Sequence, residues 1–198
     1  WLGSPTIGQA APESPVIRVG IWSNQVNIRV AATSEYSLVD TGSQKVLGKF
    51  PAGEKALIST KDTRMTVNGI PVEAREIKMV VAGTGTAEVN SRSYRGEIAL
   101  HRTKGKSGLT VVNTLPFEEY LYGIIAKEIS PEWPADAVRV QAVASRTYSM
   151  YNLGKHSDDG YDLCAGTDCQ VYGGKAKEDP RALRAVDETK GLVMTYQG

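Results

Sequence analysis

The chain has 198 residues, with 23 Lys and Arg against 22 Asp and Glu, so its formal net charge is +1. This length can bury a substantial hydrophobic core, and the near-neutral charge gives no overall electrostatic footprint for nucleic acid. No apolar run approaches the ~18 residues of a membrane-spanning helix. Because the chain begins at Trp1, we expect that any signal peptide or membrane anchor has been removed from it.

The first half of the chain has the pattern of a β-rich region. Residues 1–15 contain three prolines and no periodicity, which predicts a flexible leader. Residues 16–105 contain short alternating runs separated by turn residues, and Asn68-Gly69 supplies the two positive-φ positions of a type I′ hairpin turn. The predicted extended segments are 16–22, 26–30, 35–40, 44–49, 55–59, 65–72, 76–82, 94–102 and 108–113.

The pattern changes to helical at Leu115. A first helix is predicted over 116–129, with Pro116 in its first turn and apolar residues on one face, and a second over 134–153. Asp179-Pro180 opens a third helix that Gly191 closes.

Residues 192–196 have the pattern of a strand that starts as the chain ends, which indicates either a C-terminal truncation or a terminal strand that pairs with a preceding strand. The predicted fold class is therefore α+β: a β-rich N-terminal part made of hairpins and a meander, followed by a helical core with a few strands over 106–198.

Glu128 is the first candidate catalytic residue. It follows Leu121, Ile124 and Ile125 at helical spacings, so it is predicted to project from the apolar face of the first helix. Desolvation and the negative end of the helix dipole would both raise the pKa of a carboxyl group there, as a general acid requires. The alternatives are that Glu128 pairs with Arg139 or Arg146, or that the helix end is exposed.

The second helix offers candidate binding residues. Gln141 and Ser145 share one face, and Arg146 follows, so these polar side chains could line a groove. Packing and one salt bridge are the ordinary alternative for an alanine-rich helix with an arginine. Tyr148 and Tyr172 could stack on sugar rings, although burial in a core is the commoner role of tyrosine.

Cys164, Cys169 and the upstream His156 form a candidate metal site. Two thiolates and an imidazole could hold Zn²⁺ with one open position. A disulfide between Cys164 and Cys169, or two unrelated thiols, are the alternatives. The spacing is not that of a zinc ribbon, so it does not decide among them.

Several blocks of the sequence resemble the stage II sporulation protein D family, which includes the LytB-type amidase enhancers. The resemblance extends over roughly residues 16–198, and its specific motifs lie in 96–198. The matching blocks are Leu115–Ile129, Trp133-Pro134, Val140–Tyr148, Cys169–Gly174 and Gly191–Tyr196.

The resemblance implies a bacterial lytic transglycosylase that cleaves peptidoglycan between N-acetylmuramic acid and N-acetylglucosamine, in some members only on glycan strands without stem peptides. It implies an extracytoplasmic, wall-facing protein, and Glu128 matches the family's catalytic glutamate. No cofactor is required for that chemistry, although His156, Cys164 and Cys169 match residue types that bind zinc in some members. We also expect five side chains to contact the glycan: Gln141, Arg146, Tyr148, Gln170 and Tyr172.

The alternative function is a non-catalytic wall-binding enhancer of an N-acetylmuramoyl-L-alanine amidase. Under either function, the charge distribution suggests how the chain would hold wall polymer near its cleft. Residues 1–114 carry 14 Lys and Arg against 9 Asp and Glu, whereas residues 115–198 carry 9 against 13. We expect the basic first half to attract anionic wall polymers, in a salt-dependent way.

Overall fold

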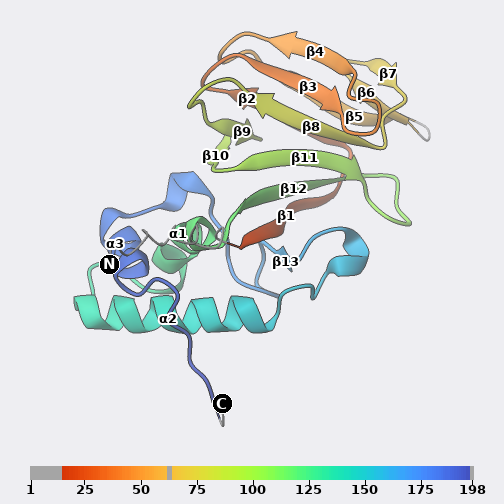
Figure 1. Ribbon diagram of the computed structural model, residues 1–198. Coiled ribbons are helices and arrows are strands. Elements are labelled where there is room, and N and C mark those ends of the chain that lie inside the picture. Colours follow the sequence, from red (N-terminus) through yellow and green to blue (C-terminus); the bar gives the residue numbers. More distant parts are fainter. Residues whose placement is uncertain (1–14, 62–63, 197–198) are drawn as a thin grey trace, which may run out of the picture.

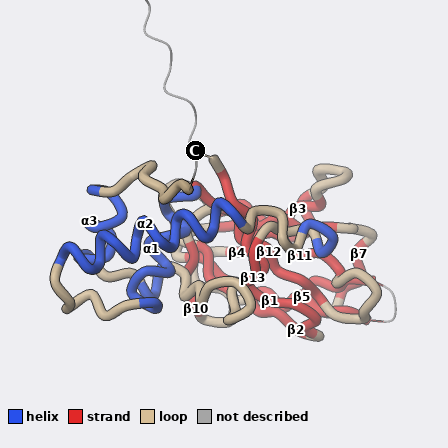
Figure 2. The backbone as a smooth tube through the Cα atoms, turned by 90° about the horizontal axis from the view of Figure 1, so that it is seen from below, coloured by secondary structure: helices blue, strands red, loops and turns tan. Residues whose placement is uncertain are grey.

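The structure, a computed structural model, describes residues 15–61 and 64–196. Two β-sheets occupy one end of the molecule and three helices gather at the other (Figures 1 and 2). The predicted α+β fold class, with its β-rich N-terminal part, is confirmed. The predicted leader over 1–15 lies outside the described residues except for Pro15. In the described part of the chain, no helix is long and apolar enough to cross a membrane.

The strands form two sheets. The seven-stranded sheet has the order β13-β1-β12-β11-β8-β3-β4, and the six-stranded sheet has the order β10-β9-β2-β5-β6-β7. The strands are β1 (Val16–Gln25), β2 (Asn27–Ala32), β3 (Tyr36–Asp40), β4 (Val46–Phe50), β5 (Ala56–Lys61), β6 (Arg64–Val67), β7 (Ile70–Val72), β8 (Glu76–Val81), β9 (Ala87–Val89), β10 (Arg92–Tyr94), β11 (Glu97–Arg102), β12 (Leu109–Pro116) and β13 (Leu163–Cys164).

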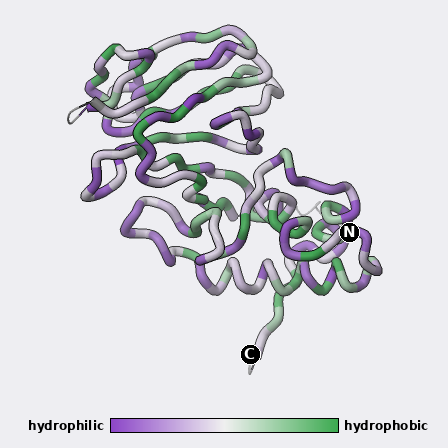
Figure 3. Tube along the Cα trace, turned by 180° about the vertical axis from the view of Figure 1, so that it is seen from behind, coloured by the Kyte–Doolittle hydropathy of each residue, from purple (hydrophilic) through white to green (hydrophobic). Residues whose placement is uncertain are grey.

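Side-chain alternation along the strands builds the core between the sheets. In β1, Ile17 and Val19 are fully buried while Val16 and Arg18 are exposed. Figure 3 shows hydrophobic and hydrophilic positions alternating along several strands. Successive side chains of a strand point to opposite faces of a sheet, so one face packs inward and the other faces solvent. The Asn68-Gly69 turn has the predicted positive φ angles, 49° and 81°.

The three helices agree closely with the predicted ranges. They are α1 (Phe117–Glu128), α2 (Ala135–Tyr151) and α3 (Pro180–Glu188), and two short 3-10 helices span Ser157–Asp159 and Lys175–Lys177. Asp179 caps α3 by accepting a hydrogen bond from the backbone N–H of Arg181 at 2.9 Å. Pro180 then occupies the first helical turn, where its missing N–H costs nothing.

The predicted strand over 192–196 is wrong: these residues form no strand. Backbone groups of this segment instead bond to side chains of α2. The carbonyl of Leu192 accepts a hydrogen bond from Arg146, and the N–H of Met194 donates to the hydroxyl of Thr147. The apolar pattern of the segment is exposed, as Leu192 and Met194 each leave more than half of their surface in solvent.

Strand β12 connects the sheet to the helices. It pairs antiparallel with β1 and β11, and its last residue, Pro116, leads directly into α1. The short strand β13 pairs parallel with the outer edge of β1. Both parts of the chain, 16–105 and 106–198, therefore contribute strands to one sheet, and this sheet fixes where α1 starts and where the loop that carries Cys164 lies.

Candidate active site

Glu128 is the last residue of α1, and its side chain is exposed to solvent. The expectation that its carboxyl group is desolvated is therefore wrong, because the apolar face of α1 ends at Ile125, one turn earlier. Among the described residues Glu128 has no hydrogen bond or ion pair. It does not pair with Arg139 or Arg146, since those residues bind other carboxylates. The structure thus leaves a free carboxyl group at the end of a rigid helix.

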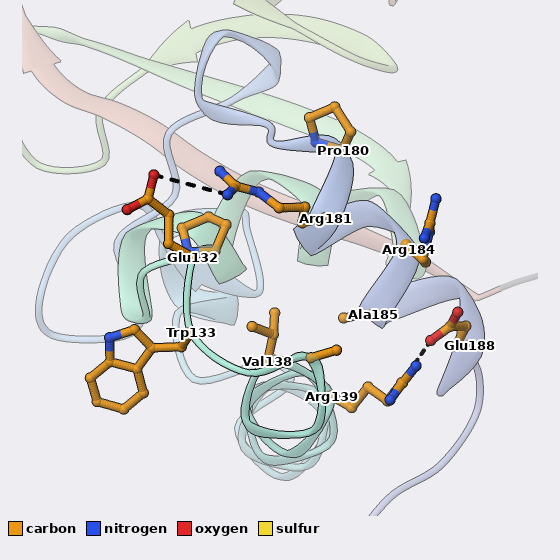
Figure 4. Close-up of a pocket in the computed structure, with 11 residues that line it drawn as sticks. Glu132, Trp133, Val138, Arg139, Pro180, Arg181, Arg184, Ala185 and Glu188 are labelled. Carbon is orange, nitrogen blue, oxygen red and sulfur yellow. Dashed lines mark hydrogen bonds and ion pairs between the residues drawn. The ribbon is translucent and has the colours of Figure 1, made fainter.

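A pocket of about 330 Å³ lies just beyond this helix end, between the α1–α2 loop, the first turns of α2, and α3. Val138 and Ala185 lie in its middle (Figure 4). An ion pair closes each side, one between Glu132 and Arg181 at 3.9 Å and one between Arg139 and Glu188 at 2.6 Å. An extended chain spans at most ~3.6 Å per residue, so the Cα of Glu128 lies within about 11 Å of that of Pro131, which lines the pocket.

A buried ion pair fixes α1 against α2. The guanidinium of Arg146, 1 % exposed, donates through Nε and Nη2 to both carboxylate oxygens of Glu118, at 3.0 and 2.8 Å. The same guanidinium donates to the carbonyls of Val186 on α3 and Leu192 beyond it. One side chain therefore connects all three helices and the C-terminal segment, and it sets the direction in which α1 presents Glu128.

A second contact holds the middle of α1 against the loop that follows the cysteines. A Cβ added at Gly123 would lie 2.4 Å from the ring of Tyr172, and the N–H of Gly173 donates to the carbonyl of Gly123 at 2.9 Å. The Tyr172 hydroxyl in turn donates to the side-chain carbonyl of Asn113 on β12. Burial raises the pKa of Tyr172, so its phenol stays neutral and acts as a structural hydrogen-bond donor.

The five predicted glycan-binding side chains are not brought together on one surface. Gln170 and Tyr172 are buried and bonded to protein groups, as is Arg146, so the structure gives these three a packing role. Gln141 is half-buried and donates to the hydroxyl of Ser145 at 3.1 Å, and Tyr148 is 38 % exposed. For Gln141 and Tyr148 the glycan contact stays a prediction.

His156, Cys164 and Cys169 do come together, and Asp168 joins them. The four potential ligand atoms all lie within 4.8 Å of one another, with His156 Nε2 3.3 Å from Cys169 Sγ and 3.2 Å from Asp168 Oδ2. In this structure the two cysteines are not bonded to each other, and burial raises the pKa of Cys169 to about 11. Ligand atoms around tetrahedral Zn²⁺ are about 3.3 to 3.8 Å apart, given bonds of ~2.0 to 2.3 Å, and the two separations from His156 Nε2 are close to this range.

The thiol cluster and Glu128 belong to opposite ends of α2. Glu128 precedes the first residue of α2, and His156 follows its last. The 17 residues of α2 span about 25 Å at 1.5 Å per residue. Because β13 places Cys164 on the edge of β1, the cluster links the loop to the sheet, at a distance from the end of α1 (Figure 1).

The pocket beside Glu128 contains residues that the sequence did not single out as a site. Trp133 is 60 % exposed, and Arg184 on α3 is exposed without any ion pair or hydrogen bond among the described residues. The signal for Trp133 was an aromatic residue between two prolines, in the loop that follows the candidate acid. No comparable signal marks Arg184, because its place depends on how α3 packs against α2.

Comparisons with known proteins support the resemblance. Residues 105–196 match the family described as Stage II sporulation protein, SpoIID. An uncharacterized protein of Brachyspira hyodysenteriae is 30 % identical over 187 residues, which cover 89 % of this chain and 50 % of that protein. The amidase enhancer of Bacillus subtilis is 37 % identical over 78 residues, which cover 39 % of this chain and 10 % of the relative.

Stage II sporulation protein D of Bacillus amyloliquefaciens is 26 % identical over 129 residues, which cover 58 % of this chain and 36 % of the relative. The chain thus spans half or less of the length of these three relatives. The matched segment contains all three helices, the thiol cluster and Glu128. Through this segment, residues 105–196, the chain is similar to the SpoIID family of stage II sporulation proteins.

Proposed function

We propose that this chain is a peptidoglycan lytic transglycosylase with Glu128 as its general acid and base, acting outside the cytoplasm on the glycan strands of the wall. The observation that carries the proposal is the position of Glu128. It offers a carboxyl group that has no partner among the described residues, at the end of a fixed helix, beside a pocket, and within the segment that matches the family.

A single carboxyl group is sufficient for the lytic reaction. The acid form of Glu128 protonates the oxygen between N-acetylmuramic acid and N-acetylglucosamine as the bond from that oxygen to the muramyl anomeric carbon breaks. The carboxylate then takes the proton of the muramyl 6-hydroxyl, whose oxygen bonds to the same anomeric carbon and gives a 1,6-anhydro end.

The products of digestion test this proposal. Peptide-free glycan strands and intact sacculi are incubated with the chain, and soluble fragments are analysed by mass spectrometry. We expect 1,6-anhydro-N-acetylmuramic acid ends, which are lighter than reducing ends by one water. Reducing ends alone would contradict the lytic reaction and indicate hydrolysis, which normally needs a second carboxyl group at the site.

The named relative from Bacillus subtilis favours a second candidate function, in which the chain enhances a cell-wall amidase. The same digestions separate the two. Release of stem peptides by an added N-acetylmuramoyl-L-alanine amidase would rise in the presence of the chain, and glycan ends would not accumulate. A chain with Glu128→Gln would stimulate the amidase as well as the wild type does, because no glycan cleavage is involved.

We also propose that His156, Cys164 and Cys169 bind one Zn²⁺, with Asp168 or water as the fourth ligand. Such an ion would tie the loop after α2 to strand β1, and it would stabilise the fold because the unfolded chain does not hold the ligands together. The separation along α2 favours this structural role over contact with the glycosidic bond.

The two histidines of the chain provide a matched test of the zinc site. We expect one equivalent of zinc by elemental analysis in the wild type and in His101→Ala, and almost none in His156→Ala. Chelation should lower the midpoint of thermal unfolding and expose two titratable thiols. A metal-free protein without titratable thiols would instead establish a disulfide between Cys164 and Cys169.

A further inference from the structure

The pocket beyond α1 has an apolar middle of small side chains. Val138 and Ala185 are 2 % and 4 % exposed, so the pocket reaches down to the contact between α2 and α3. Its volume of about 330 Å³ is at the lower end of the range for small-ligand sites. Val138 and Ala185 form an apolar floor of the pocket. A methyl group of a ligand fits on this floor, because burying apolar surface is favourable and a methyl group needs no hydrogen-bond partner.

The cations around this floor are not equivalent. Arg139 binds Asp136 and Glu188, each at 2.6 Å. Arg181 donates from Nε and Nη2 to both carboxylate oxygens of Asp179 and holds the pKa of Asp179 at about 2. Arg184 has no ion pair or hydrogen bond anywhere in the described part of the chain. Among the pocket's three arginines, Arg184 is thus the one that can pair with an incoming anion without giving up a protein partner.

Trp133 supplies a flat apolar surface at the edge of the same pocket. Its indole is 60 % exposed and projects from the loop (Figure 4), which a backbone hydrogen bond from Trp133 N–H to the carbonyl of Ser130 helps to fix. An exposed indole is a favourable contact for the face of a sugar ring or for an acyl chain.

We propose that this pocket is a substrate subsite that binds a carboxylate carried on an N-acylated unit of peptidoglycan. The inference rests on the proposed function. Arg184 pairs with the carboxylate, Val138 and Ala185 contact an acyl methyl group, and Trp133 covers the adjoining ring or chain. Because the pocket begins three residues after Glu128, the proposal places its ligand on the strand that is cleaved.

Peptidoglycan offers this chemistry from two sources. A muramyl sugar without its stem peptide exposes its lactyl carboxylate, and a stem peptide exposes a carboxylate at its end. Arg184 recognises either one by charge-assisted hydrogen bonds, so the choice between them has to be made by separate probes.

The test measures binding by isothermal titration, in a Glu128→Gln background so that the probe is not cleaved. The probes are a peptide-free muramyl tetrasaccharide, an N-acetylated stem tripeptide, and tetra-N-acetylchitotetraose, which has no carboxylate. We expect one of the two carboxylate probes to bind more tightly than the chitotetraose. Adding Arg184→Ala should raise the dissociation constant of that probe about tenfold or more and leave that of the chitotetraose unchanged. Adding Arg29→Ala, an exposed arginine on β2 outside the pocket, should change neither.

Three outcomes would overturn the inference: equal binding of carboxylate and neutral probes, binding that Arg184→Ala does not weaken, or no binding of any probe. A different result would refute the proposed function. A wild-type chain that releases no glycan fragments, yet binds a carboxylate probe through Arg184, would refute the transglycosylase and leave the subsite in place.

Discussion

Glu128→Gln lowers the rate of glycan-strand cleavage by about 10²- to 10⁴-fold, the usual effect of removing a general acid and base. The amide has nearly the size of the carboxyl group but neither donates an acidic proton nor accepts one. Glu128 is exposed and has no protein partner among the described residues, so we expect the free energy of unfolding to change by less than about 0.5 kcal/mol. The measurements are fragment release from peptide-free strands and urea denaturation.

Glu132→Gln is the matched control for this experiment. Glu132 is a second exposed glutamate of the same region, four residues further on, and its ion pair with Arg181 is long at 3.9 Å. Because Glu132 lines the pocket proposed as a subsite, a mechanism with one carboxyl group predicts that Glu132→Gln changes substrate binding (KM) and leaves kcat within a few-fold of the wild type. Equal loss in both variants would indicate a pair of catalytic carboxyl groups, and a wild-type rate for Glu128→Gln would remove Glu128 from the mechanism.

Local signals in the sequence were sufficient to predict most of the helices and strands. Helix boundaries agreed to within two residues where a proline or a capping residue marked the start, as at Pro116, Pro134 and Asp179. The short strands β9 and β10 were missed as separate elements because they have only three residues each. Their turn is formed by Asn90 and Ser91, which both have positive φ without a glycine to signal it.

Tertiary packing decided what the sequence did not predict. The polarity of α2 left two interpretations open, a groove or packing with one salt bridge, and the structure supports the second for Arg146. The position of α3 buries this side chain, and no pattern within α2 specifies where α3 will lie. The apolar face of α1 was identified correctly as far as Ile125, yet Glu128 itself is exposed although Ala126 and Ile129 beside it pack against the core. The association of His156 with Asp168 also depends on a fold-back of the loop that spacing alone does not determine.

Arg146→Met is expected to be the most destabilising substitution of an ionic residue in the helical part. Methionine is an apolar side chain of comparable length, but the Glu118 carboxyl group, 16 % exposed, loses its buried partner. Removing one member of a buried ion pair typically costs about 3 to 5 kcal/mol, because an uncompensated charge remains. The carbonyls of Val186 and Leu192 lose donors as well. Urea denaturation of the variant and the wild type measures the difference.

Two further variants show whether the unpaired charge of Glu118 causes the loss of stability in Arg146→Met. Arg64→Met removes the ion pair with Glu73, whose side chains are 61 % and 80 % exposed, and should cost less than about 1 kcal/mol. Combining Arg146→Met with Glu118→Gln should recover part of the lost stability, since no buried charge is then left unpaired. If the double variant is as unstable as Arg146→Met alone, the hydrogen bonds to α3 and the C-terminal segment carry the stabilisation. In that case Arg146 holds α1 in place through the packing of α3, and the orientation of Glu128 depends on the third helix as much as on the ion pair.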